Sequence, residues 1–95
     1  MFARTTQFKL KSGMLEAVTS EFPNIRAQTS QIEGGICNYA MWNEDGAGMT
    51  VAIYESAAAA EAAGPKIAAI WGGLADYLAE PPVFSSFTTA ANMRE

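Results

Sequence analysis

The chain has 95 residues, of which 49% are hydrophobic and 17% are charged. This length predicts a single domain over residues 1-95, and the apolar content excludes a disordered chain. The formal net charge is −4 and the six Lys and Arg residues are scattered singly, so we expect no nucleic-acid partner.

The first two predicted elements are a strand over residues 2 to 10 and an amphipathic helix over residues 15 to 25, which Pro23 should bend or interrupt. The more apolar face of the strand carries Phe2, Arg4, Thr6, Phe8 and Leu10. Arg4 is unexpected on such a face, because its guanidinium must reach solvent, pair with an acidic residue or meet an anionic ligand. We therefore take Arg4 and its neighbour Thr6 as candidate ligand-binding residues.

The next two predicted elements are strands on either side of an Asp45-Gly46 turn. With an even-numbered loop, Trp42 pairs with Met49 and Asn38 pairs with Ile53, and paired residues share one face of the sheet. We expect that face to lie under the helices, with the aliphatic row of Met49, Val51 and Ile53. An odd-numbered loop with a bulge would reverse this arrangement. Because a buried amide needs a partner, Asn38 either bonds to backbone or water, or it binds a ligand.

The last two predicted elements are a helix and a strand. The helix begins after a Ser56 cap, runs through an alanine-rich stretch and should break or kink at Gly64-Pro65. Its second half carries an apolar stripe of Ile67, Ile70, Trp71, Leu74 and Leu78. Core packing explains Trp71 as well as a ligand-binding role does, and both interpretations stay open. Residues 83 to 91 have the β-branched and aromatic content of a final strand.

The chain contains one cysteine, Cys37, and no histidine. An intrachain disulfide and a cysteine-rich zinc site are therefore excluded, and the single thiol suits the reducing cytoplasm, where we expect the protein. Catalysis by Ser-His-Asp or Cys-His groups and the ordinary histidine ligation of zinc or haem are also excluded. We expect no cofactor and no metal. The N-terminus does not resemble a signal peptide, and no apolar run approaches the roughly 18 residues of a membrane span.

The element order βαββαβ predicts an α+β fold of the ferredoxin-like type, with a four-stranded antiparallel sheet and two helices on one of its faces. The other face would be uncovered, and the apolar content is high for so short a chain. We therefore expect a homodimer whose sheets pack through Thr5, Gln7, Thr50, Ala52 and Tyr54.

Three segments carry a resemblance: "FARTTQFKLKSG" at the start, "IYES" followed by alanines, and "EPPVFSSFTTAA" near the end. They are similar to the dimeric α+β barrel superfamily, and within it to small antibiotic biosynthesis monooxygenase-like proteins. The resemblance covers nearly the whole chain. It implies two sheets paired into a barrel and a ligand cavity between the sheet and the helices of each protomer. Members include oxygenases that act on polycyclic phenols or quinols without metal or flavin, haem-degrading enzymes, and proteins with no assigned activity.

In the resembling oxygenases, a cavity amide and a tryptophan hold a substrate oxyanion, which implies Asn38 and Trp42 as catalytic candidates here. Haem-degrading relatives carry their functional Asn near the position of Thr6, and this chain lacks a haem-binding histidine, so haem degradation is not expected. Two functions stay open. One is a cofactor-free monooxygenase of a phenolic or quinol substrate, and the other is a non-catalytic small-ligand-binding or structural dimer. The expected partners are a second copy and a small aromatic ligand.

Overall fold

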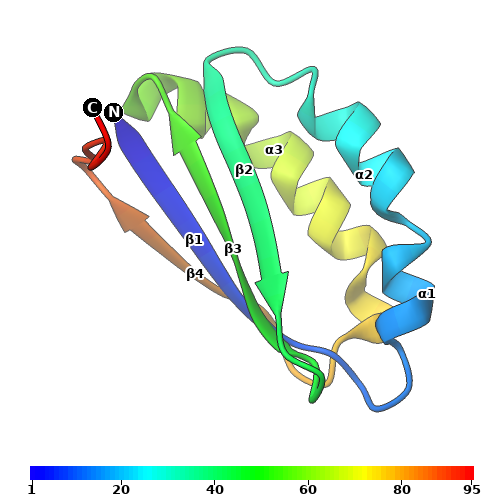
Figure 1. The fold of residues 1–95 in the computed structure, drawn as a ribbon. Coiled ribbons are helices and arrows are strands. Elements are labelled where there is room, and N and C mark those ends of the chain that lie inside the picture. The colour runs from blue at the N-terminus through cyan, green and yellow to red at the C-terminus, as the bar shows by residue number, and fades with distance from the viewer.

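The computed structural model describes residues 1 to 95 and shows one four-stranded antiparallel sheet with the helices on one of its faces (Figure 1). The strand order across the sheet is β2-β3-β1-β4. The elements follow the chain as β1 (Phe2–Lys9), α1 (Leu15–Thr19), α2 (Phe22–Thr29), β2 (Gly35–Trp42), β3 (Ala47–Tyr54), α3 (Ala57–Gly73), a 3₁₀ turn (Ala75–Tyr77) and β4 (Val83–Phe87). The predicted α+β, ferredoxin-like fold is therefore confirmed.

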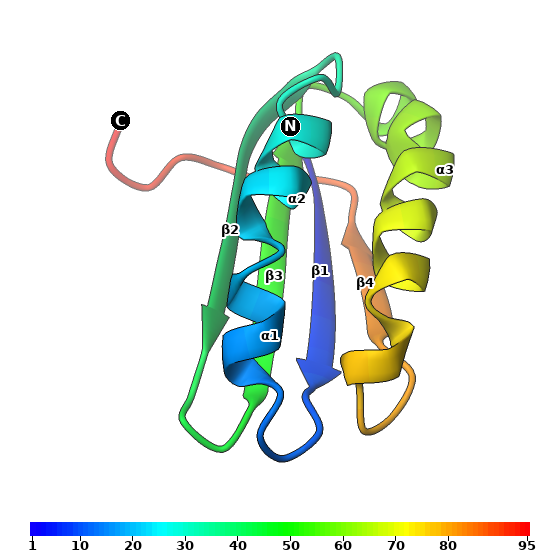
Figure 2. The same ribbon diagram turned by 90° about the vertical axis from the view of Figure 1, so that its right-hand side faces the viewer.

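The two prolines of the helical layer occupy different positions in their helices. The first helical region is interrupted as predicted, and Pro23 lies in the first turn of α2, where its missing amide hydrogen leaves no bond unmade. The Ser56 hydroxyl caps α3 by accepting the N–H of Ala59 at 3.1 Å. At the second proline the prediction was a break or a kink, and α3 continues through Pro65 as one helix, so there is no break. Figure 2 shows α1 and α2 on the β2 side of the sheet and α3 on the β4 side.

The hairpin between β2 and β3 has an odd-numbered loop, formed by residues 44 to 46. Gly46 has a φ of +88°, which is the left-handed conformation that closes a three-residue hairpin loop. The Asp45 carboxylate accepts the N–H of Ala47 at 3.0 Å and lies 3.6 Å from the Lys9 ammonium group. These two interactions lower the pKa of Asp45, the bond from Ala47 more than the charge of Lys9. The side chain of Asp45 thus helps to fix the odd loop.

The odd loop decides which row of β3 lies under the helices. Asn38 pairs with Ala52 and Trp42 pairs with Gly48, one residue away from the predicted register. The helix-facing row of β3 is therefore Gly48, Thr50, Ala52 and Tyr54. The prediction for the aliphatic row was wrong, and the outer face of the sheet carries Met49, Val51 and Ile53. Asn38 and Trp42 keep their predicted place on the helix side.

The buried core is divided into two clusters near opposite ends of β1. One cluster consists of Phe2, Tyr54, Ala60 and Ala63. The other consists of Leu10, Val18 and Leu78. Only 10 of the 95 residues are buried, so the sheet and the helices close on each other at the two ends and remain apart in the middle.

Gly48 leaves room for the Phe8 ring to lie across β3. A Cβ atom added at Gly48 would overlap both the Phe8 ring and the Met41 carbonyl group. We expect Gly48→Ala to lower the free energy of unfolding by about 1 to 3 kcal/mol, the usual cost of overpacking, in urea denaturation. An added Cβ at Gly72 in α3 would meet nothing within 4 Å, so the control Gly72→Ala should be neutral or stabilising by up to about 1 kcal/mol. If Gly48→Ala were as stable as the wild type, the ring would not be fixed in this place.

Candidate ligand-binding cavity

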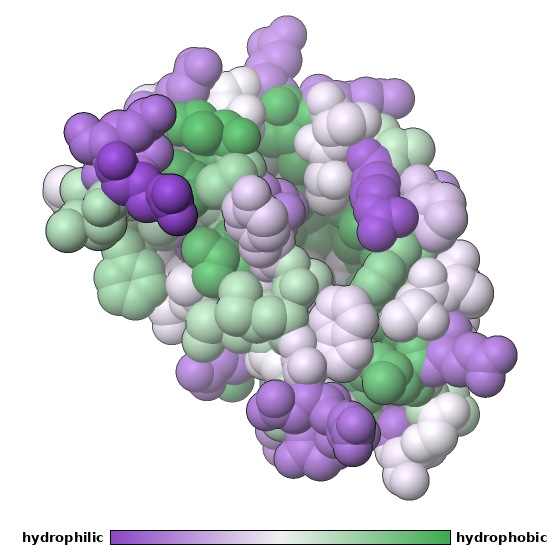
Figure 3. All heavy atoms as spheres, in the orientation of Figure 1, coloured by the Kyte–Doolittle hydropathy of each residue, from purple (hydrophilic) through white to green (hydrophobic).

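A cavity of about 760 Å³ lies between the sheet and the helices, in the space that the two core clusters leave open. Of the 24 residues that line it, 16 are hydrophobic. Figure 3 shows a recess on this side of the molecule, between the sheet and α2, with a mainly hydrophobic inner surface. The volume lies in the range of roughly 300 to 1,000 Å³ that is typical of small-molecule sites, so the cavity has room for a ligand of several fused rings.

The register of the strands decides which side chains share the cavity floor. One row across the four strands is formed by Asn38, Ala52, Arg4 and Ser86. In the next rows of β3, Thr50 lies between Thr6 and Ala40, and Gly48 lies between the larger Phe8 and Trp42. The floor is therefore low along β3. Because neighbouring strands are about 4.8 Å apart, the backbones of Asn38 and Arg4 are roughly 10 Å apart across this low strip.

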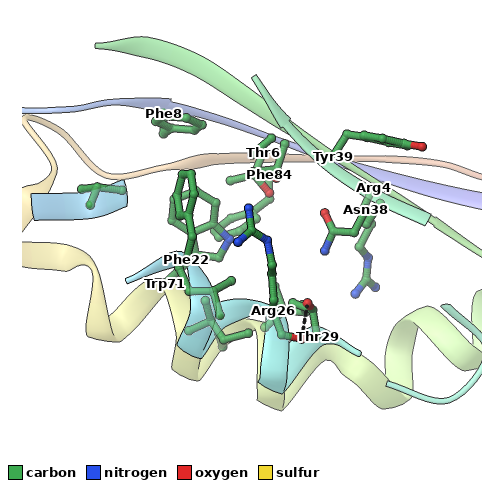
Figure 4. Close-up of a pocket in the computed structure, with 18 of the residues that line it drawn as sticks. Arg4, Thr6, Phe8, Phe22, Arg26, Thr29, Asn38, Tyr39, Trp71 and Phe84 are labelled. Carbon is green, nitrogen blue, oxygen red and sulfur yellow. Dashed lines mark hydrogen bonds between the residues drawn. The ribbon is translucent and has the colours of Figure 1, made fainter. Parts of the chain in front are cut away.

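Two groups of aromatic rings, here called the two aromatic walls, line the cavity, and Figure 4 shows Phe8, Phe22, Trp71 and Phe84 gathered at one end of it. On the β2 side, Trp42 packs edge-to-face against Phe22 of α2, with ring centroids 5.3 Å apart. On the β4 side, Trp71 of α3 contacts Phe8 with a centroid distance of 5.7 Å and Phe84 with a distance of 6.4 Å. Such pairs fix the orientation of each ring, and rings of this kind offer a planar aromatic ligand a surface to pack against.

Asn38 reaches into the cavity from β2, as Figure 4 shows. The residue is exposed on this side, and no other residue of the chain forms a hydrogen bond with its amide. A backbone partner was one of the two interpretations of Asn38, and the structure does not contain it. The amide N–H and carbonyl groups are therefore both free to meet a ligand.

Arg4 has a partner that the sequence did not suggest. Its Nη1 group donates a hydrogen bond to the carbonyl oxygen of Ala60 in α3 at 2.8 Å, and its Cζ atom lies 5.6 Å from the centroid of the Phe2 ring. The charge of Arg4 also affects the pKa of Tyr54, a buried residue that lines the same cavity. Burial raises the pKa of Tyr54, while the positive charge of Arg4 acts in the opposite direction. Tyr54 is thus a neutral phenol at physiological pH.

Arg26 is a cavity residue that the sequence analysis missed. Figure 4 shows its side chain extending from α2 towards the sheet, between Phe22 and Asn38. Its Cζ atom lies 5.7 Å from the centroid of the Phe22 ring. The spacing of four residues from Phe22, a member of the predicted apolar stripe, was the available signal, because such residues share one face of a helix.

All five predicted site residues line this one cavity: Arg4, Thr6, Asn38, Trp42 and Trp71. Thr6 is 5% exposed and lies in the middle of the floor. No group of three or more His, Cys, Asp and Glu residues is placed to hold a metal ion. No helix of this chain combines the length and the apolar composition needed to cross a membrane.

The sequence matches no protein-family model and no curated protein. Solved structures nevertheless share the fold over nearly the whole chain. A candidate antibiotic biosynthesis monooxygenase from Nitrosomonas europaea is 16% identical, with a TM-score of 0.80 over 96% of this chain and 100% of its own. SnoaB, a cofactor-independent oxygenase from Streptomyces nogalater, is 15% identical, with a TM-score of 0.78 over 99% and 97%.

A third similar structure is a monooxygenase from Streptomyces coelicolor in complex with nanaomycin D. It is 19% identical, with a TM-score of 0.72 over 97% of this chain and 89% of its own. The resemblance to antibiotic biosynthesis monooxygenase-like proteins is therefore confirmed, and at these identities it is a likeness of fold.

Proposed function

We propose that this protein is a cofactor-independent monooxygenase whose substrate is a planar phenol or quinol bound in the cavity. The observation that carries the proposal is the free amide of Asn38, which lies beside the small side chains of β3 in a cavity with two aromatic walls. The proposal is also supported by two structures of the same fold, one a cofactor-independent oxygenase and the other a monooxygenase in complex with nanaomycin D.

The proposed reaction begins with a substrate anion. An anthrone-like substrate loses a proton to water and binds as its enolate, whose oxygen accepts a hydrogen bond from the Asn38 amide. The apolar walls strengthen this bond by excluding water. No carboxylate or imidazole lines the cavity, so the substrate must be acidic enough to ionise without a protein base.

The enolate itself supplies the electrons for its oxygenation. Its ring carbon forms a bond to O₂, and protonation gives a hydroperoxide. Loss of the remaining hydrogen from that carbon and cleavage of the O–O bond then release water and leave a carbonyl group. One oxygen atom enters the product and the other leaves as water, and four electrons pass from the substrate to O₂. The reaction therefore needs no flavin and no metal. Trp42, which is held by Phe22, would keep the ring plane in register with Asn38.

Oxygen uptake with anthrone tests this proposal. We expect the purified protein, with a metal chelator and without flavin, to speed oxygen consumption above the buffer rate and to yield anthraquinone. The exposed Lys66 lies outside the cavity, so Lys66→Gln should keep this activity. If a range of phenols and quinols bound the protein without faster oxygen uptake, the alternative of a non-catalytic ligand-binding protein would replace the proposal.

We also propose that a second copy of the chain covers the outer face of the sheet. Tyr39 is 66% exposed and Phe87 is 52% exposed on this face, which carries mainly apolar side chains. They include Cys37, Tyr39, Met41, Met49, Val51, Ile53, Val83 and Phe87. An extended apolar surface of this kind is typical of a protein interface.

Of the residues predicted for this interface, Thr5 and Gln7 lie on the outer face of the sheet, whereas the prediction was wrong for Thr50, Ala52 and Tyr54. Light scattering should report about twice the 10.1 kDa chain mass.

A further inference from the structure

We infer that the cavity selects an aromatic ligand bearing a carboxylate group, and that Arg26 binds this group. The inference rests on the proposed function for the position of the aromatic ring. It concerns a second part of the ligand, which takes no part in the oxygenation.

The charges around the cavity are unbalanced. Two guanidinium groups, those of Arg4 and Arg26, line it, and no acidic side chain does. The one salt bridge of the chain joins Lys9 to Asp45, away from the cavity. This local positive charge belongs to a chain with a formal net charge of −4. A ligand anion would supply the missing negative charge beside Arg26, which is exposed in the free chain.

Arg26 is better placed than Arg4 to bind the anion. Arg4 already donates a hydrogen bond to the Ala60 carbonyl group. Arg26 has no hydrogen-bond acceptor in the chain, and its side chain points towards the sheet beside Asn38. Its guanidinium lies near the Phe22 ring, and such contacts help to orient the group. A guanidinium with its donors free can bind a carboxylate through two parallel hydrogen bonds, a geometry that a single amide donor does not offer.

The same arrangement indicates how the ligand lies. Its ring would rest on Thr50 and Ala52, beside the two aromatic walls, because the Phe8 ring already covers Gly48. The ring oxygen would face Asn38 on β2, and the carboxylate would face Arg26 on α2. The carboxylate would therefore be attached to the edge of the ring that faces the helices.

Ligand binding can be followed by intrinsic fluorescence, because the chain has two tryptophans, Trp42 and Trp71, and both line the cavity. We would titrate the wild type with 2-naphthoate and with 2-naphthamide, which have the same ring and similar size but differ in charge. We expect 2-naphthoate to bind about 10- to 100-fold more tightly, the usual range for one charge-assisted hydrogen bond. The preference should fall as the salt concentration rises.

Arg26→Gln should abolish this preference without changing the affinity for 2-naphthamide, whereas Lys66→Gln on α3 should leave the preference intact. Equal affinities of the wild type for the two ligands would overturn the inference. So would a preference that survives in Arg26→Gln, or one that is lost in Arg4→Gln alone. Binding is read without turnover, so a charge preference in a protein that consumes no oxygen would refute the proposed oxygenase and leave this inference standing.

Discussion

Asn38→Ala should lower kcat for oxygen uptake by about 10²-fold, the usual cost of removing one donor to an oxyanion. The enolate oxygen would lose its hydrogen bond at the stage where negative charge must be held beside apolar walls. Folding should survive the change, because no other residue of the chain bonds to the Asn38 amide. A substitution of this kind usually changes the free energy of unfolding by less than about 0.5 kcal/mol.

The experiment pairs oxygen uptake with thermal denaturation on the same samples. Asn38→Asp is the matched variant, because it keeps the shape of the side chain and replaces the donor by a negative charge. The kcat of Asn38→Asp for oxygen uptake should be no higher than that of Asn38→Ala. A loss of about 1 to 3 kcal/mol in stability with unchanged turnover would instead make Asn38 a structural amide. A stable Asn38→Ala protein with unchanged turnover would refute both roles.

Val51→Asp should convert the proposed dimer into a monomer. Val51 pairs with Thr5 on one side and Tyr39 on the other, so it lies in the interior of the outer face rather than at its rim. A carboxylate buried there without a partner typically costs about 3 to 5 kcal/mol, which is a roughly 10²- to 10⁴-fold weaker association. Light scattering should then report the 10.1 kDa chain mass at micromolar concentration.

Ala62→Asp is the matched control for this prediction. It introduces the same carboxylate at an exposed position of α3, in the helical layer and outside the cavity. Its mass should remain that of the wild type. If Val51→Asp and the wild type had the same mass, the outer face would not be the interface between two copies.

The fold could be predicted from the sequence because strand alternation, helical spacing and turn residues all pointed to one element order. The face of β3 that the helices cover could not be predicted from the sequence. Its more apolar row, Met49 to Ile53, lies outside, while the cavity side carries Thr50 and Ala52. Hydrophobicity identifies a covered face only when the opposite face is polar, and this sheet is apolar on both. The Asp45-Gly46 loop held the deciding information, since its side-chain bond and left-handed glycine fix an odd length.

The placement of the candidate residues in one cavity depended less on the register. Asn38 and Trp42 are four residues apart on β2, and residues an even number apart on a strand share one face. Their common face therefore did not depend on how β2 pairs with its neighbour. Arg4 was correctly noticed as unusual, but its hydrogen bond to Ala60 joins residues 56 positions apart, which no local pattern reveals. Arg26 was missed because an arginine on a helix is normally a solvated surface residue.

The division of the core has a consequence for how this chain can change over time. Phe2 and Leu10 anchor the two clusters that hold the sheet to the helices, and the inward-facing residues between them on β1, Arg4, Thr6 and Phe8, line the cavity. Substitutions in this middle region can alter the shape and charge of the cavity while the ends keep the chain folded. A scaffold of this kind can exchange one ligand for another at little cost in stability, and sequences that share it can drift far apart. Structures only 15% to 19% identical to this chain still follow its fold along nearly its whole length.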